Sequence, residues 1–229
     1  MIDGSALANQ HLSQFAHLVD GAGRVWSTDA DLWNIFEPWS SGDLVVSPIE
    51  LNVRPDAPLG GYWLETGFYD TFSQAPLPIT QNGHPLGASL RIGPLRAGSA
   101  AAAPKGPALG VFGENELALL HVEWRGEDVS VDWQALDKPR ASYTVFVHAI
   151  DGEGKIVAQQ DTVPRGGSYP TSLWEAGDVV RDTYRLGIKP SPSVRLEIGL
   201  YTQPGLRRLP LRKAGQPAVD HLDVAAPAQ

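Results

Sequence analysis

The fold is decided by residues 143–161, which read YTVFVHAIDGEGKIVAQQD. Residues 143–150 are β-branched, aromatic or apolar on both faces, as expected for the central strand of a sandwich. An Asp-Gly-Glu-Gly segment follows, and then a second strand-like run. This order predicts a β-hairpin. Calcium loops also begin with aspartate and glycine, but the later ligands and the closing glutamate of such a loop are missing, so a tight turn is predicted.

The same hairpin pattern occurs a second time in the chain. Residues 14–29 read QFAHLVDGAGRVWSTD, and Phe15, His17 and Asp20 match residues 146, 148 and 151 at an offset of 131. Residues 64–90 match residues 196–222 at an offset of 132. The matched pairs in that block include Leu64 with Leu196, Glu65 with Glu197, Gly67 with Gly199 and Tyr69 with Tyr201. We therefore expect an internal duplication of one domain.

The domain boundaries follow from this repeat and from a change in composition. Residues 97–109 read AGSAAAAPKGPAL, a small and flexible composition that is typical of a linker. We expect one β-sandwich copy at 1–96, the linker at 97–109 and a second β-sandwich copy at 110–229. Each copy has the length of an ordinary domain.

Copy two is predicted to be all-β. Val194, Leu196 and Ile198 alternate with polar or small residues, which is the period of a strand with one apolar face. Similar runs predict strands at 116–124, 128–135, 142–150, 155–161, 179–187, 194–202, 206–212 and 218–225. Turn signals at this spacing favour an antiparallel sandwich, immunoglobulin-like or jelly-roll-like.

Copy one is shorter at its start than copy two. Fourteen residues precede Phe15, whereas copy two has two strand-like runs before Phe146. A sandwich that lacks two strands exposes sheet edges and apolar surface. We expect copy one to be completed by residues outside this sequence or by a partner, or its open side to be covered by the second copy or by the linker. The first strand, near 12–19, is expected close to that open side.

Composition excludes several classes of function. The net charge of −8 does not provide the basic field that nucleic acid requires. Without cysteine there are no disulfides and no thiolate chemistry. No apolar stretch approaches the roughly 20 residues of a membrane span, and the start of the chain does not read as a signal peptide. Membrane association is expected only through a parent segment outside this sequence.

Three aromatic residues are the candidate ligand-binding residues. Trp39, Tyr169 and Trp174 lie in polar loops that contain proline, and an exposed indole can stack on a sugar ring. The alternative is that these rings fold back as a lid over the end of the sandwich. The repeat of Trp39 at Trp174, followed each time by Gly-Asp, favours the lid.

No catalytic residue, metal or cofactor is predicted. His17 and His148 repeat, but no matching ligand set accompanies them, which favours strand histidines with a structural role. Repeated carboxylates at 65 and 197, and at 43 and 178, leave glycoside hydrolysis as an alternative, since its two acids are usually distant in sequence. Carboxylates on the polar face of a strand are normally solvated.

The segments YTVFVHAIDGEGKIVAQQD, YPTSLWEAGDVVRDTYRL and LEIGLYTQPGLRRLPL together resemble a known type of module. Copy two is similar to the soluble β-sandwich modules at the C-terminal ends of bacterial membrane glycosyltransferases, of the dolichyl-phosphate-mannose protein mannosyltransferase class, and of related surface proteins. The resemblance implies a location outside the cytoplasm and an accessory role, with catalysis in a membrane-embedded part. It transfers no catalytic residue.

The sequence thus predicts a non-catalytic, extracytoplasmic accessory or binding module for a glycan or a protein partner. A second hypothesis is an architectural subunit of a surface or membrane complex, whose first domain is completed by a neighbouring chain in an oligomer. A glycoside-active enzyme is the third.

Overall fold

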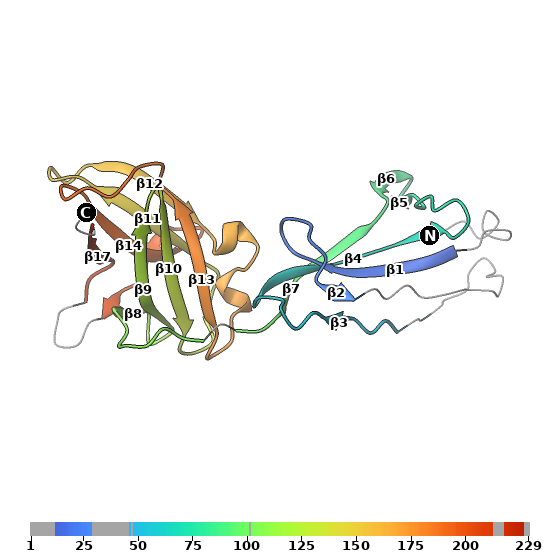
Figure 1. Ribbon diagram of the computed structural model, residues 1–229, viewed down its shortest axis with the longest axis horizontal. Helices are drawn as coiled ribbons and strands as arrows, with labels where there is room; N and C mark the ends of the chain where they lie inside the picture. The colour runs from blue at the N-terminus through green and yellow to red at the C-terminus, as the bar shows by residue number, and fades with distance from the viewer. Residues whose placement is uncertain (1–11, 29–45, 47, 101, 213–217, 227–229) are drawn as a thin grey trace. The chain divides into compact units, whose positions relative to one another are not determined.

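A computed structural model describes residues 12–28, 46, 48–100, 102–212 and 218–226 of the chain (Figure 1). The chain divides into two compact units, Met1–Gly98 and Ser99–Gln229. The described residues form an all-β protein in which every strand pair is antiparallel. Their helical segments are two short 3-10 turns, Arg165–Gly167 and Thr171–Leu173. None of the described helices is long and apolar enough to cross a membrane.

The first sheet of the second unit has five strands in the order β13-β10-β9-β8-β16. Strand β10 alternates Val129, Val131 and Trp133, each with 0% of its surface exposed, with polar residues, as the period of two predicts. The strands of this sheet are β8 (Gly110–Phe112), β9 (Leu117–Arg125), β10 (Asp128–Ala135), β13 (Val179–Arg185) and β16 (Leu211–Arg212).

The second sheet of this unit has the order β12-β11-β14-β15, and β17 also pairs with β14. All eight residues of β11 are buried, which confirms the prediction of a strand that is covered on both faces. The strands are β11 (Tyr143–Ile150), β12 (Ile156–Thr162), β14 (Arg195–Thr202), β15 (Arg207–Arg208) and β17 (Leu222–Ala225).

The glycine-rich segment between β11 and β12 is the predicted tight turn. One oxygen of Asp151, Oδ1, accepts hydrogen bonds from the backbone N–H groups of Glu153 and Lys155, at 3.0 and 2.9 Å. Gly154 follows with a φ of 83°, a left-handed conformation that favours glycine. The Asp151 carboxylate therefore holds the turn by binding its backbone, as the turn interpretation expects.

The predicted strand at 206–212 is wrong in one respect, because the structure divides it between the two sheets. Strand β15 belongs to one sheet and β16 to the other, with Pro210 between them. Proline has no N–H to donate to a ladder and interrupts a strand. On either side, Leu209 donates to the carbonyl of Leu200 at 2.8 Å, and the Pro210 carbonyl accepts from Gly113 at 2.9 Å.

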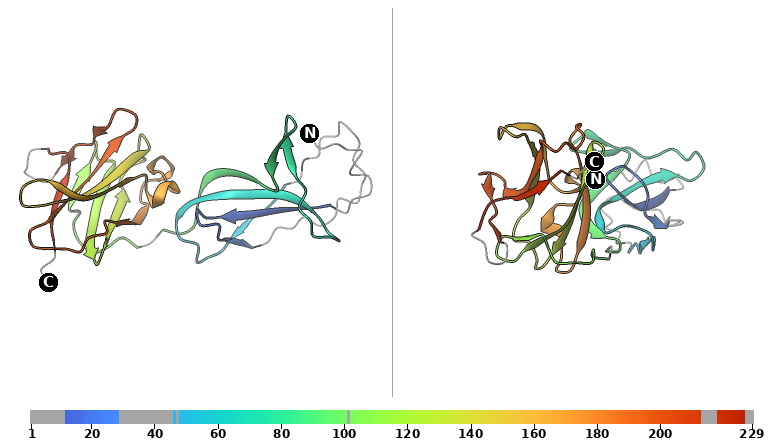
Figure 2. Two further views of the ribbon diagram at one scale, coloured as in Figure 1. Left: turned by 90° about the horizontal axis from the view of Figure 1, so that it is seen from above. Right: turned by 60° about the vertical axis from the view of Figure 1, so that its left-hand side comes forward.

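The first unit contains a three-stranded sheet in the order β1-β4-β7, with the β5–β6 hairpin beside it (Figure 2). The predicted first strand is confirmed at β1. The strands are β1 (Leu12–Val19), β2 (Ser27–Thr28), β3 (Asn52–Val53), β4 (Gly60–Asp70), β5 (Ile79–Gln81), β6 (His84–Gly87) and β7 (Leu90–Ala97). Short pairs join β2 with β3 and β5 with β6.

Strand pairs of the two units share one register. His17 lies opposite Glu65 in β1 and β4, and His148 lies opposite Glu197 in β11 and β14. These are the pairs that the sequence offsets match. The third strand continues the correspondence, because residue 91 lies opposite Glu65 and residue 223 lies opposite Glu197.

Two matched glycines explain a shared packing detail. Gly67 lies opposite Phe15, and Gly199 lies opposite Phe146. A Cβ atom would lie 2.8 Å from the ring of Phe15 at the first glycine and 2.5 Å from the ring of Phe146 at the second. Both distances are too short for carbon atoms, so each phenylalanine ring lies in space that only glycine leaves open.

Candidate functional site

The predicted ligand-binding aromatics are fully buried where the structure describes them. Tyr169 and Trp174 each have 0% exposed surface, and their ring centroids are 5.9 Å apart. Trp39 lies outside the described residues. Since stacking on a sugar requires an accessible ring face, this burial favours the lid alternative for Tyr169 and Trp174.

Hydrogen bonds fix these rings in the second unit. The Trp174 Nε1–H donates to the Tyr169 carbonyl at 3.1 Å, and the Tyr169 hydroxyl donates to Asp178 Oδ2, also at 3.1 Å. Thr171 Oγ1 accepts from the N–H of Tyr143 and donates to the carbonyl of residue 141, both at 2.8 Å. The loop that carries the aromatics is therefore fastened to the start of β11.

His148 is paired with a carboxylate on the neighbouring strand. Its Nε2 lies 2.8 Å from Asp161 Oδ1, and its side chain is 9% exposed. The Phe146 ring lies 4.9 Å from the imidazole, and the Arg208 guanidinium lies 4.4 Å from the Phe146 ring centroid. Burial, followed by the charge of Asp161, raises the pKa of the nearby Tyr201. The pairing of His148 with Asp161 joins β11 to β12.

The repeated glutamates are ion-paired. In the first unit, Ser89 Oγ donates to Glu65 Oε1 at 2.6 Å, and Arg91 Nη2 donates to Oε2 at 3.2 Å. The hydrogen bond from Ser89 and the charge of Arg91 hold the pKa of Glu65 below its usual value. A general acid for glycoside hydrolysis needs a raised pKa, so Glu65 does not suit that role. Asp43, another repeated carboxylate, lies outside the described residues.

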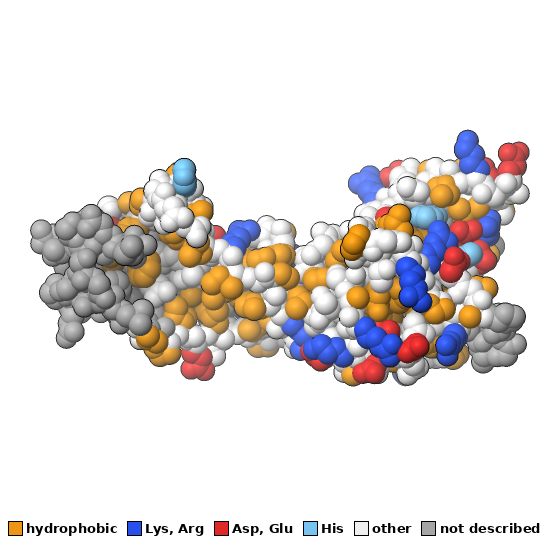
Figure 3. Space-filling model, turned by 180° about the vertical axis from the view of Figure 1, so that it is seen from behind, with side chains coloured by type: hydrophobic (Ala, Val, Ile, Leu, Met, Phe, Trp, Pro, Cys, Tyr) orange, Lys and Arg blue, Asp and Glu red, His pale blue; other side chains and the backbone are white. Residues whose placement is uncertain are grey.

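An apolar strip on β7 is the most exposed hydrophobic feature of the three-stranded sheet. Leu90, Ile92 and Leu95, here called the β7 strip, are 40%, 53% and 43% exposed. They pair with Thr66, Leu64 and Tyr62 of β4, whose side chains share one face of the sheet by alternation. One side of this unit also displays many hydrophobic and few charged side chains (Figure 3).

In the second unit the matches of Leu90 and Leu64 are buried. Val224, which matches Ile92, is partly buried, and the match of Leu95 lies outside the described residues. Leu222, which matches Leu90 in sequence, is 4% exposed, and Leu196, which matches Leu64, is 1% exposed. Leu64 itself is only partly buried. The same register thus carries a covered face in one unit and a partly uncovered face in the other.

Sequence reasoning expected apolar surface on copy one but did not identify the residues that form it. The available signal was the alternation of Leu90 and Ile92 with Arg91, which predicts a strand with an apolar face. Leu95 is out of phase with this pattern, and only the register irregularity between Tyr62 and Leu64 pairs it with Tyr62. Pattern alone does not reveal whether a second layer covers such a strand.

No protein-family model matches the chain, and a search of curated proteins finds no match either.

Proposed function

We propose that the chain is a non-catalytic protein-binding module, and that a neighbouring chain completes its first unit. The observation that carries this proposal is the exposure of the β7 strip: Leu90 is 40% exposed, whereas Leu222, its match in the second unit, is 4% exposed. Large exposed apolar patches mark interaction surfaces in soluble proteins.

The finer architecture is part of the same proposal. We infer that the two sheets of the second unit pack face to face as a sandwich, because both supply side chains with no exposed surface. Val129 and Val131 of β10 and Val145 and Val147 of β11 are each 0% exposed. We further infer that the units arose by duplication, which the shared register supports. The first unit is then a partial sandwich.

The energetic gain from covering the β7 strip is moderate. Fully burying a leucine or isoleucine side chain contributes about 1.5–3 kcal/mol. Roughly half of each side chain in the strip is already covered, so each contributes about 1 kcal/mol on further burial. Three such residues form an anchor for an interface, to which the partly buried Leu64 and Thr66 of β4 add contact area.

The partner is expected to cover the face of the sheet and not to extend its edge. Strand β7 carries Arg91, Pro94 and Arg96, and charged residues and proline on an edge strand oppose the addition of another strand. The partner is therefore expected to contact the face of the sheet that carries the aliphatic side chains of residues 90, 92 and 95.

A second copy of the chain is the neighbour to which this proposal commits, in line with the expected oligomer through copy one. The resemblance to glycosyltransferase modules supports an accessory role outside the cytoplasm. A glycan ligand has less support, since Tyr169 and Trp174 offer no ring face.

Thiol labelling tests this function directly, because the natural chain has no cysteine. Ile92→Cys introduces a single thiol on the β7 strip, and Val157→Cys, at a residue that is 44% exposed in the second unit, is the matched control. If copies cover the strip, the thiol at 92 reacts with maleimide more slowly as protein concentration rises, and light scattering reports an oligomer. The thiol at 157 reacts with maleimide at the same rate at every protein concentration. A monomer at all concentrations, with both thiols equally reactive, would contradict the proposal.

A further inference from the structure

Three metal-ligating side chains meet on the β14–β17 strand pair of the second unit. Glu197 on β14 lies directly opposite Asp223 on β17, and His221 comes two residues before Asp223. One donor atom from each residue lies within 4.8 Å of the other two. Two of the three residues, Glu197 and Asp223, lie on paired strands of one sheet, and paired strands hold side chains in a rigid geometry that suits a binding site.

The spacing of the donor atoms is close to that of a coordination shell. His221 Nε2 lies 3.6 Å from Asp223 Oδ2 and 3.9 Å from Glu197 Oε1. Both distances exceed those of a hydrogen bond. Tetrahedral zinc with bonds of 2.0–2.2 Å places its ligand atoms about 3.4 Å apart. Shifts of a few tenths of an ångström would bring the histidine nitrogen to that spacing from each carboxylate, and the two carboxylates already lie within 4.8 Å of each other.

The orientation of His221 is fixed from its other side. Asp220 Oδ1 lies 2.6 Å from His221 Nδ1, and an ionised carboxylate can only accept a hydrogen bond. Nδ1 therefore carries a proton, and in the neutral ring Nε2 presents its lone pair to the two carboxylates. A histidine that donates one ring N–H to a carboxylate and offers the other nitrogen has the arrangement of metal-binding histidines.

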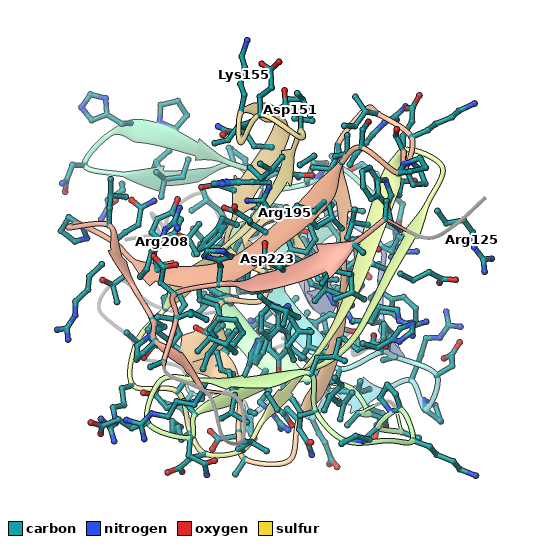
Figure 4. The ribbon with its side chains drawn as sticks, turned by 90° about the vertical axis from the view of Figure 1, so that its left-hand side faces the viewer. Arg125, Asp151, Lys155, Arg195, Arg208 and Asp223 are labelled. Carbon is teal, nitrogen blue, oxygen red and sulfur yellow. The ribbon has the colours of Figure 1, made fainter. Side chains whose placement is uncertain are left out.

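Arg195 is the resident cation of this cluster. Its Nη2 lies 2.6 Å from Glu197 Oε1, and its Nε lies 2.9 Å from Asp223 Oδ1. Arg195 and Asp223 lie together on these strands (Figure 4). The Arg195 side chain is 41% exposed, so it can turn toward solvent when another cation takes its place. Arginine and a metal ion would therefore compete for the same two carboxylates.

The first unit provides an internal comparison at the same register. Glu65 matches Glu197, but Ser89 stands where the second unit has His221, and Arg91 stands where it has Asp223. Arg91 and Ser89 both donate hydrogen bonds to Glu65. A hydroxyl and a guanidinium at these positions offer no imidazole and add a positive charge, so the first unit lacks this ligand set there.

We propose that Glu197, His221 and Asp223 form a binding site for a divalent transition-metal ion, with zinc as the favoured ion. One imidazole and two carboxylates suit zinc, whereas calcium and magnesium take oxygen ligands. Three protein ligands leave a fourth position for water or for a group of a ligand. Asp220 is a positioning residue that holds the histidine ring.

Calorimetric zinc titration of the purified full chain tests the site. We expect one zinc ion per chain, and His221→Ser, which installs the residue of the first unit, should weaken binding by at least tenfold. His148→Ala removes a different histidine of the same unit and should leave zinc affinity unchanged. Circular dichroism of each variant checks that the fold is retained.

Two further variants test the roles of the neighbouring residues. Asp220→Asn should weaken zinc binding about 10–100-fold, the usual effect of losing a partner that orients a ligand. Arg195→Ala should strengthen it, because a competing cation is removed. Equal zinc affinity in the natural chain and His221→Ser, or no binding at millimolar zinc, would overturn the proposal.

Discussion

Trp174→Ala should destabilise the second unit strongly while leaving the first unit unchanged. The Trp174 side chain has 0% exposed surface, and its indole N–H binds the Tyr169 carbonyl. A buried tryptophan removes about 150–250 Å² from water, and truncating it to alanine in a core costs about 3–5 kcal/mol. The carbonyl of Tyr169, left without this donor, accounts for about 1 kcal/mol of that cost.

Denaturation with guanidinium, followed by circular dichroism, measures this change. The free energy of unfolding of the second unit should fall by about 3–5 kcal/mol, and its melting temperature by roughly 10–20 °C. Leu206→Ala in the same unit is the control, because Leu206 is 68% exposed and its truncation should stay within about 0.5 kcal/mol. A Trp174→Ala variant that unfolds with the parent would show that the indole does not pack as described.

Two further predictions test the shared strand frame and the electrostatics of the first unit. Gly199→Ala should cost about 1–3 kcal/mol by overpacking, because its new Cβ would lie 2.5 Å from the ring of Phe146, whereas Gly152→Ala meets nothing within 4 Å. Equal melting temperatures for these two variants would contradict this. Ser89→Ala should raise the pKa of Glu65 as measured by NMR titration, since the Ser89 hydrogen bond is the largest contribution to its lowering. A carboxylate whose pKa is lowered in the folded state stabilises the fold at pH values above its unfolded pKa, and this stabilisation is lost as the pH falls through the folded pKa. Because the pKa of Glu65 is higher in the variant, the variant should lose this stabilisation at a higher pH than the natural chain does.

Most strands of the second unit were predictable because each depends on local pattern. Period-two alternation in β10 and β14, and the turn at Asp151, follow from neighbouring residues. The division of 206–212 at Pro210 was missed because both halves keep the alternation of a strand. Only the pairing of β16 with β8 shows that the chain changes sheets there.

The candidate sites were less predictable, because they depend on what lies across the sheet. The sequence around Trp174 fits both an exposed indole that stacks on a sugar and an indole that folds back as a buried lid. Which of the two occurs depends on contacts with residues that are distant in sequence. The histidine at 221 was not a candidate, since nothing near it in sequence suggests that Glu197 lies beside it. Strand register supplies that information, by placing Glu197 against Asp223.

One strand frame, proposed to be duplicated, can carry two different tasks when the side chains around it differ. In the first unit, Ser89 and Arg91 each donate a hydrogen bond to Glu65. The β7 strip of the same unit is exposed. In the second unit, the matched aliphatic position at 222 is buried, and the polar side offers His221 beside Glu197. If both proposals hold, Ile92→Lys should abolish association without changing zinc affinity, and His221→Ser should do the reverse. Loss of both properties in either variant would mean that the two units do not act separately.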